Sequence, residues 1–208
     1  MTLTLRDRVF ETKQGELVAG IRDPYWSKKY DKNKPVFLSW ELEFGTKGTV
    51  YDDERWTPGV YHHNLRFNVR RWTDILGEVV EWNTPYDVAT GERHGGFYVF
   101  EYENISRAKL CFVERDGFNF HVKWDGFCNV YSGDDAYGAD VPFSLDAWAT
   151  FTRIRVNGSE FDTNESLWGR LAKFVDPEDY ILHSTEERFG PYNSGVWARS
   201  AVFTPRGG

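Results

Sequence analysis

The sequence has little or none of several features that define common protein classes. It contains only two cysteines, Cys111 and Cys128, and no run approaching the roughly 18 apolar residues that a membrane-spanning helix needs. The first fourteen residues, MTLTLRDRVFETKQ, lack the apolar core of a secretory signal. We therefore expect reduced thiols, a cytoplasmic location and no interaction with a membrane.

Positive charge is also in short supply. Lys and Arg together number 25 against 32 for Asp and Glu, which gives a formal net charge of −7. Nucleic-acid binding depends on clustered basic side chains that contact phosphates, so we do not expect it as a main activity. An acidic chain is better suited to a basic protein partner, whose approach its charge would steer. The sequence leaves the oligomeric state open.

Motifs for common catalytic and cofactor sites are missing. There is no HExxH, HxH, CxxC, GxSxG, GxGxxG or phosphate-binding loop in the chain. We therefore expect no cofactor. The histidines have no zinc-ligand spacing, although His62 and His63 follow three acids closely; the five histidines are His62, His63, His94, His121 and His183.

The segment YSGDDAYGAD, residues 131–140, is the stretch that most resembles a site. Alternate positions counted from Asp134 reach Ala136 and Gly138, which supply no side-chain oxygen, so a regular calcium loop is excluded. An irregular calcium site built on Asp134, Asp135 and Asp140 remains open. The alternative is a connection between strands, in which Asp and Gly provide turn geometry.

Aromatic residues are abundant, with 9 Trp, 11 Tyr and 16 Phe, enough to build a sizeable core. Most of the chain alternates between apolar and polar residues with a period of two, which is typical of strands with one buried face. The stretches with this pattern are 36–44, 64–70, 96–105, 107–114, 118–126, 147–159 and 195–203. In 96–105, this pattern places Tyr98, Phe100 and Tyr102 on one face, opposite Glu101 and Glu103.

Two segments have a different pattern. Residues 162–175 have a helical stripe of Leu167, Leu171, Phe174 and Val175, with Asp162 and Glu165 at the spacing of a capping box. Residues 72–82 could form a second, shorter helix. The sequence thus predicts a mainly β, β-rich α+β fold: an antiparallel sandwich or a curved meander sheet with one or two packed helices. We expect a single domain over residues 1–203 and a flexible tail over 204–208.

One hairpin allows a prediction of register. A three-residue loop ending at Gly117 would pair Phe112 with Phe120 and Leu110 with Val122, and a slip by one residue would mix the two faces. The same register places Cys111 opposite His121. A thiol beside an imidazole is the core of a cysteine nucleophile, although a flat sheet surface offers no pocket for a substrate.

Two further kinds of site can be weighed. Glu41 with Glu43, and Glu101 with Glu103, have the strand spacing of two glycosidase carboxylates, but alternating glutamates are also ordinary on the wet face of a strand. Some aromatic residues could stack on sugar rings, and Trp124, Tyr131 and Tyr137 are the candidates nearest the acidic segment. The simpler interpretation of most aromatic residues is a buried core.

The preferred hypothesis is a non-catalytic protein-binding protein, of the inhibitor or immunity-protein type, that presents an acidic, aromatic surface to a basic partner. One alternative is a carbohydrate-binding or glycan-active protein. A second alternative is an enzyme with a dispersed site, to which Asp52, Asp53, His62, His94 and His121 could contribute. The residues predicted to contact the protein partner are Asp52, Asp53, Glu54, Asp134, Asp135, Tyr137 and Asp140.

Overall fold

The computed structural model describes residues 1–21, 36–89, 91–130, 138–189 and 196–207. The described chain is mainly β, with one α-helix, α2 (Asn164–Leu171), and two short 3₁₀ helices, Trp72–Ile75 and Pro177–Asp179. The strands are β1 (Thr2–Leu5), β2 (Arg8–Glu11), β3 (Gly15–Ile21), β4 (Leu38–Gly45), β5 (Thr49–Tyr51), β6 (Glu54–Trp56), β7 (Gly59–Leu65), β8 (Val79–Trp82), β9 (Gly95–Tyr98), β10 (Tyr102–Asp116), β11 (Asn119–Val130), β12 (Gly138–Ser159), β13 (Tyr180–Phe189) and β14 (Val196–Pro205).

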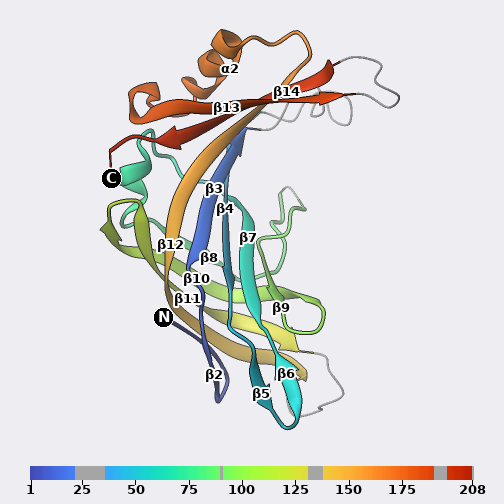
Figure 1. Cartoon of the computed structure of the whole chain (residues 1–208). Helices are drawn as coiled ribbons and strands as arrows, with labels where there is room; N and C mark the ends of the chain where they lie inside the picture. The colour runs from blue at the N-terminus through green and yellow to red at the C-terminus, as the bar shows by residue number, and fades with distance from the viewer. Residues whose placement is uncertain (22–35, 90, 131–137, 190–195, 208) are drawn as a thin grey trace.

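The long strand β12 organises the main sheet (Figure 1). One edge of β12 pairs with β11 and, further along the chain, with β14. Its other edge pairs with β1 and then, in parallel, with β3. Because the order β11–β10–β9–β7–β4–β3–β12 returns to β11, seven strands form a ring of pairings that surrounds the core. The predicted mainly β fold with a packed helix is confirmed, in the form of a strongly curved sheet that contains the β10–β11–β12 meander.

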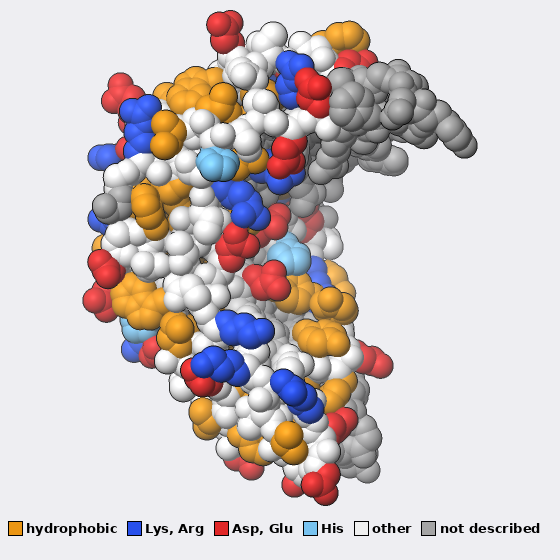
Figure 2. Space-filling view, in the orientation of Figure 1, with side chains coloured by type: hydrophobic (Ala, Val, Ile, Leu, Met, Phe, Trp, Pro, Cys, Tyr) orange, Lys and Arg blue, Asp and Glu red, His pale blue; other side chains and the backbone are white. Residues whose placement is uncertain are grey.

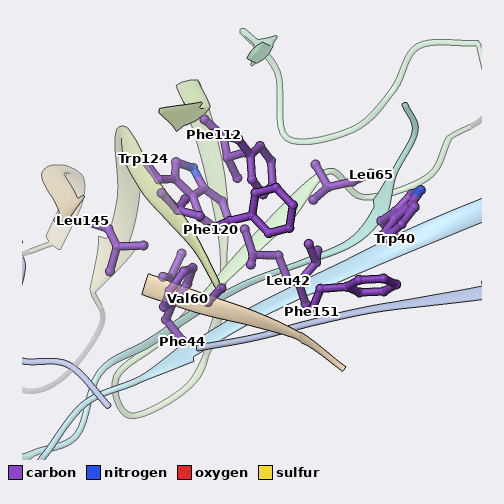
Figure 3. Packing of buried hydrophobic residues seen from close by; sticks show 14 of the residues in the cluster. Trp40, Leu42, Phe44, Val60, Leu65, Phe112, Phe120, Trp124, Leu145 and Phe151 are labelled. Atoms are coloured by element: carbon purple, nitrogen blue, oxygen red, sulfur yellow. The ribbon is translucent and has the colours of Figure 1, made fainter. Parts of the chain in front are cut away.

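Large apolar side chains fill the inside of this curved sheet. Trp40, Phe44, Phe120, Trp124 and Phe151 are all less than 2% exposed. Figure 3 shows side chains from several strands directed toward one another in this core. The aromatic stripes of the sequence therefore serve mainly as packing surface, and each buried ring removes a large apolar area from water.

The β10–β11 hairpin has the predicted faces but not the predicted register. Leu110 lies opposite Trp124 and Phe112 opposite Val122, with Asp116 paired to Asn119 across a two-residue turn. The pairing shifts between Phe112 and Glu114, so Val113 has no partner on β11 and forms a β-bulge. The prediction that Phe112 pairs with Phe120 is therefore wrong, and so is the pairing of Cys111 with His121.

Other boundaries also differ from the sequence pattern. The stretch 96–105 is divided by a bend between β9 and β10, and its buried side chains are Phe97, Val99 and Ile105. The segment 72–82 forms a 3₁₀ turn and then strand β8 instead of a second α-helix. Strand β7 ends at Leu65, earlier than the alternation over 64–70 suggests.

The C-terminal part of the chain forms a unit at one end of the sheet, where α2 lies beside β13 and β14, away from the β5–β6 hairpin (Figure 1). Thr163 caps the N-terminus of α2: its hydroxyl accepts the backbone N–H of Ser166, in a capping box that differs from the predicted Asp162–Glu165 pair. Leu167, Leu171 and Val175 are buried as predicted.

Asp162 joins this helix to the end of β12. Its carboxylate accepts the backbone N–H of Ser159 at 2.7 Å and two hydrogen bonds from Arg170 at 2.7 and 2.8 Å. Instead of ending in a turn at Asn157 and Gly158, β12 runs through both residues, which pair with β14. Strand β14 extends to Pro205, and the backbone N–H of Arg206 donates a hydrogen bond to the carbonyl oxygen of Asp179 at 2.7 Å.

Candidate functional site: an acidic and tyrosine-rich end of the sheet

The acids predicted to contact a partner lie in two regions, residues 52–54 and residues 134–140. The structure describes all of the first region and residues 138–140 of the second. Asp52 and Asp53 form the tight turn between β5 and β6, both with positive φ angles, and Glu54 begins β6. Asp140 lies near the start of β12. Asp134, Asp135 and Tyr137 lie outside the described residues, as does most of the segment considered as a calcium site.

Two of these acids are already paired with arginines of the same chain. Asp52 forms an ion pair with Arg8, whose guanidinium also lies 4.1 Å from the centre of the Trp56 ring. Asp140 accepts a hydrogen bond of 2.6 Å from Arg107. These pairs reduce the negative charge that the two carboxylates present to a partner.

Further acids lie at the same end of the sheet. The rings of Trp56 and Phe100 are in edge contact at 5.0 Å, which joins the β5–β6 hairpin to the bend that contains Glu101. The neighbouring Glu103 has its pKa raised, first by partial burial and then by repulsion from Glu101. These two glutamates are an interacting pair of carboxylates; Arg93 already offsets part of the rise in the pKa of Glu103, and a further cation placed beside the pair would relieve the rest of the repulsion.

Three tyrosines form a continuous strip on the outer surface of β7, β9 and β10. Tyr98 and Tyr102 lie opposite each other in register with ring centres 5.0 Å apart, and the ring of Tyr61 meets Tyr102 at 6.1 Å. Tyr61 covers Gly96, where a Cβ atom would come within 2.2 Å of its ring. Tyr102 is 71% exposed, so the strip presents aromatic surface to solvent. We call Tyr61, Tyr98 and Tyr102 the tyrosine strip.

The sequence pattern did not reveal this strip. It grouped Tyr98, Phe100 and Tyr102 on one aromatic face but did not show that this face is turned outward: Tyr98 and Tyr102 are exposed, whereas Phe97 and Val99 are buried. The glycine pair at 95 and 96 was the available signal, because a strand without side chains leaves room for an aromatic ring from its neighbour. Trp124, a candidate for stacking on sugars, is fully buried.

The charge distribution favours the same end of the molecule. Figure 2 shows acidic and basic side chains intermixed over most of the visible face, with acidic ones at the lower tip, where Figure 1 places the β5–β6 hairpin. Asp53 and Glu54 are both exposed there. The chain as a whole is acidic, and some of its exposed acids lie together at the β5–β6 hairpin.

The proposed cysteine–histidine pair is not formed. Cys111 lies opposite Lys123, and His121 lies opposite Glu114 on the bulged part of the hairpin. His121 instead places Nε2 at 2.6 Å from Asp146 and stacks on Trp148. Its partners are a carboxylate and an indole, and these hold the imidazole on the outer surface of the sheet without bringing it to a thiol.

The residues considered for a dispersed enzyme site do not converge. Asp52 and Asp53 lie at the hairpin tip, whereas His62 is 2% exposed inside the sheet with its ring centre 6.2 Å from that of His94. His121 lies on the outer surface of β11. Across the described ranges, no three His, Cys, Asp or Glu side chains are grouped closely enough to hold a metal ion.

Comparison with known proteins does not identify the chain: no family, curated protein or solved structure matches it. Among the described residues, no helix has the length and apolar character needed to cross a membrane.

Proposed function

We propose that this chain is a non-catalytic protein-binding protein that holds a basic partner at the acidic, tyrosine-rich end of its sheet. The observation that carries the proposal is the exposed pair Tyr98 and Tyr102, in ring contact with each other and adjacent in sequence to the interacting carboxylates Glu101 and Glu103. Tyrosine is enriched among the residues that dominate binding energy in protein interfaces.

The chemistry of this end of the sheet suits lysine or arginine side chains. A cation gains from the face of an exposed tyrosine ring and from two carboxylates that repel each other. Asp53 and Glu54 on the nearby hairpin add negative potential, which would steer a basic partner toward the same end. An inhibitor or immunity protein that neutralises a basic enzyme is one form that such a function could take.

A cytoplasmic location is part of the proposal. Both cysteines are free thiols, and burial raises the pKa of Cys128, which keeps that thiol protonated and unreactive. A reducing compartment is where a protein of this kind retains two free thiols over its lifetime.

The test is affinity capture from a native lysate, with wild-type protein compared against matched variants and captured proteins identified by mass spectrometry. Tyr98→Ser combined with Tyr102→Ser should reduce capture of the specific partner about tenfold or more, because both aromatic anchors are lost. The control is Phe161→Ser, which removes an aromatic ring that is 85% exposed outside this end of the sheet. Circular dichroism should show all variants folded.

Charge provides the second arm. Glu101→Gln combined with Glu103→Gln should slow association, and added salt should slow association of the wild-type protein more than that of this variant. If the captured protein is acidic, or if neither double variant changes its capture, the proposal is wrong.

A further inference from the structure

A second surface, on the outer side of the sheet, forms a shallow groove of about 180 Å³. It is lined by Gln14, which precedes β3, by Asp116 and Asn119 at the β10–β11 turn, and by Trp148 of β12. These residues meet because β12 exchanges one neighbour for another at this point: Asp146 still pairs with β1, whereas Ala149 pairs with β3. The alternation of β12 buries Ala147 and Ala149 and directs Trp148 outward.

The indole of Trp148 is held in a fixed orientation. It stacks on the imidazole of His121 with ring centres 5.1 Å apart and an angle of 18° between the planes. The imidazole is held in turn by Asp146, at 2.6 Å from Nε2. An aromatic side chain fixed in this way loses little conformational entropy when a ligand packs against it.

The two amides of the groove are also fixed in place. Nε2 of Gln14 donates to Oδ1 of Asn119 at 3.3 Å and to Oγ1 of Thr150 at 3.0 Å. The hydroxyl of Thr150 donates to the same Oδ1 at 2.7 Å. The amide oxygen of Gln14 and the amide nitrogen of Asn119 have no hydrogen-bond partner within the described part of the chain, so an accepting oxygen and a donating NH2 group remain for a ligand.

These features restrict the class of ligand. The carboxylate of Asp116 and the net charge of −7 disfavour an anion, and three polar lining residues out of four disfavour an apolar molecule. The groove is smaller than the roughly 300–1,000 Å³ of sites for drug-sized ligands. Neighbouring donors and acceptors beside an aromatic surface match a sugar ring, which has adjacent hydroxyl groups and a face of C–H bonds.

We propose that this groove is a saccharide-binding subsite that takes one neutral sugar ring. The ring packs a C–H face against Trp148, and its hydroxyls donate to Asp116 and Gln14 and accept from Asn119. The subsite is separate from the tyrosine strip, so its existence does not depend on the proposed protein partner. The residues of this subsite differ from Trp124, Tyr131 and Tyr137, which were the sequence candidates for stacking on sugars.

The test is titration of ¹⁵N-labelled protein with glucose, galactose, mannose and N-acetylglucosamine, followed by NMR, and a glycan array for larger ligands. At least one sugar should shift the indole N–H of Trp148 and the side-chain amides of Gln14 and Asn119 with saturable, millimolar affinity. Trp148→Ala should weaken this binding about tenfold or more, since the aromatic surface is removed.

A second variant and a control keep the test decisive. Gln14→Ala changes an exposed side chain and should weaken binding severalfold without affecting the fold. Tyr98→Ser combined with Tyr102→Ser should leave sugar binding unchanged, which separates this proposal from the protein-binding one. The proposal is overturned if no sugar or arrayed glycan gives saturable shifts, or if binding survives both Trp148→Ala and Gln14→Ala.

Discussion

His62 should make the stability of this protein depend strongly on pH. Its imidazole is 2% exposed and lies against the rings of Trp82, His94 and Trp124. Nδ1 accepts the backbone N–H of Asn64 at 3.2 Å, so the proton of the neutral ring is on Nε2. Burial, together with repulsion from His94 and His63, lowers the pKa of His62 to about 3.

The direction and size of the effect follow from proton linkage. In the unfolded chain His62 binds a proton below its ordinary pKa of about 6.5, whereas in the folded protein it stays neutral down to about pH 3. The contribution to stability is therefore fully present above pH 6.5 and is lost as the pH falls. The free energy of unfolding should decrease by about 1.4 kcal/mol per pH unit, which amounts to about 2 kcal/mol at pH 5.

The assay is urea denaturation followed by tryptophan fluorescence between pH 4.5 and pH 8, in about half-unit steps. His62→Gln should lower stability at pH 8, because a packed ring is lost, but it should also remove about 1.4 kcal/mol per pH unit of slope below pH 6.5. His183→Gln changes an exposed histidine of β13 and serves as the control. Equal slopes for wild type and His62→Gln would refute the reasoning, since another group would then bind the proton.

Three further changes should alter stability in urea or thermal denaturation. Asp162→Ala should lower the free energy of unfolding by about 3 kcal/mol, because Arg170 loses its nearly buried partner; an unchanged value would show that the ion pair contributes nothing. Gly158→Ala should cost about 1–3 kcal/mol, because its Cβ would come within 2.6 Å of Asp162 and 2.7 Å of Leu167. By contrast, Gly169→Ala in α2 meets no atom within 4 Å and should stabilise the protein by up to about 1 kcal/mol; destabilisation would contradict the helix assignment.

The sequence predicted which side chains of the β10–β11 hairpin are buried, but not which residues of the two strands pair with each other. Leu110, Phe112, Phe120, Val122 and Trp124 are all buried, as their alternation indicates. Their register was wrong because the turn lies at Gly117 and Phe118, which displaces the pairing next to it by three residues, and the bulge then reduces the displacement to two residues at Phe112 and Leu110. Since the side-chain period of a strand is also two, such a displacement keeps every residue on its own face, and the burial pattern contains no information against it.

Bends inside a strand were invisible for a related reason. Alternation over 96–105 continues through the bend that separates β9 from β10, so the pattern gives no sign that the strand is interrupted there. Conversely, the Asn157-Gly158 pair resembles a hairpin turn locally, but both residues pair with β14. Pairing with a distant strand decided the structure there, and local propensity is a weak guide when tertiary contacts oppose it.

The candidate sites depend on contacts between distant segments, which alternation does not determine. Asp52 is paired with Arg8, and Asp140 with Arg107, across separations of 44 and 33 residues. A count of charges therefore overstates the negative charge that these two acids present. It also misses the tyrosine strip, which exists because β7 lies beside β9 and β9 beside β10. These pairings place exposed tyrosines and the glutamates Glu101 and Glu103 beside one another, which no single stretch of the sequence indicates. Substitutions of these residues, more than of the paired aspartates, therefore test the proposed binding of a basic partner.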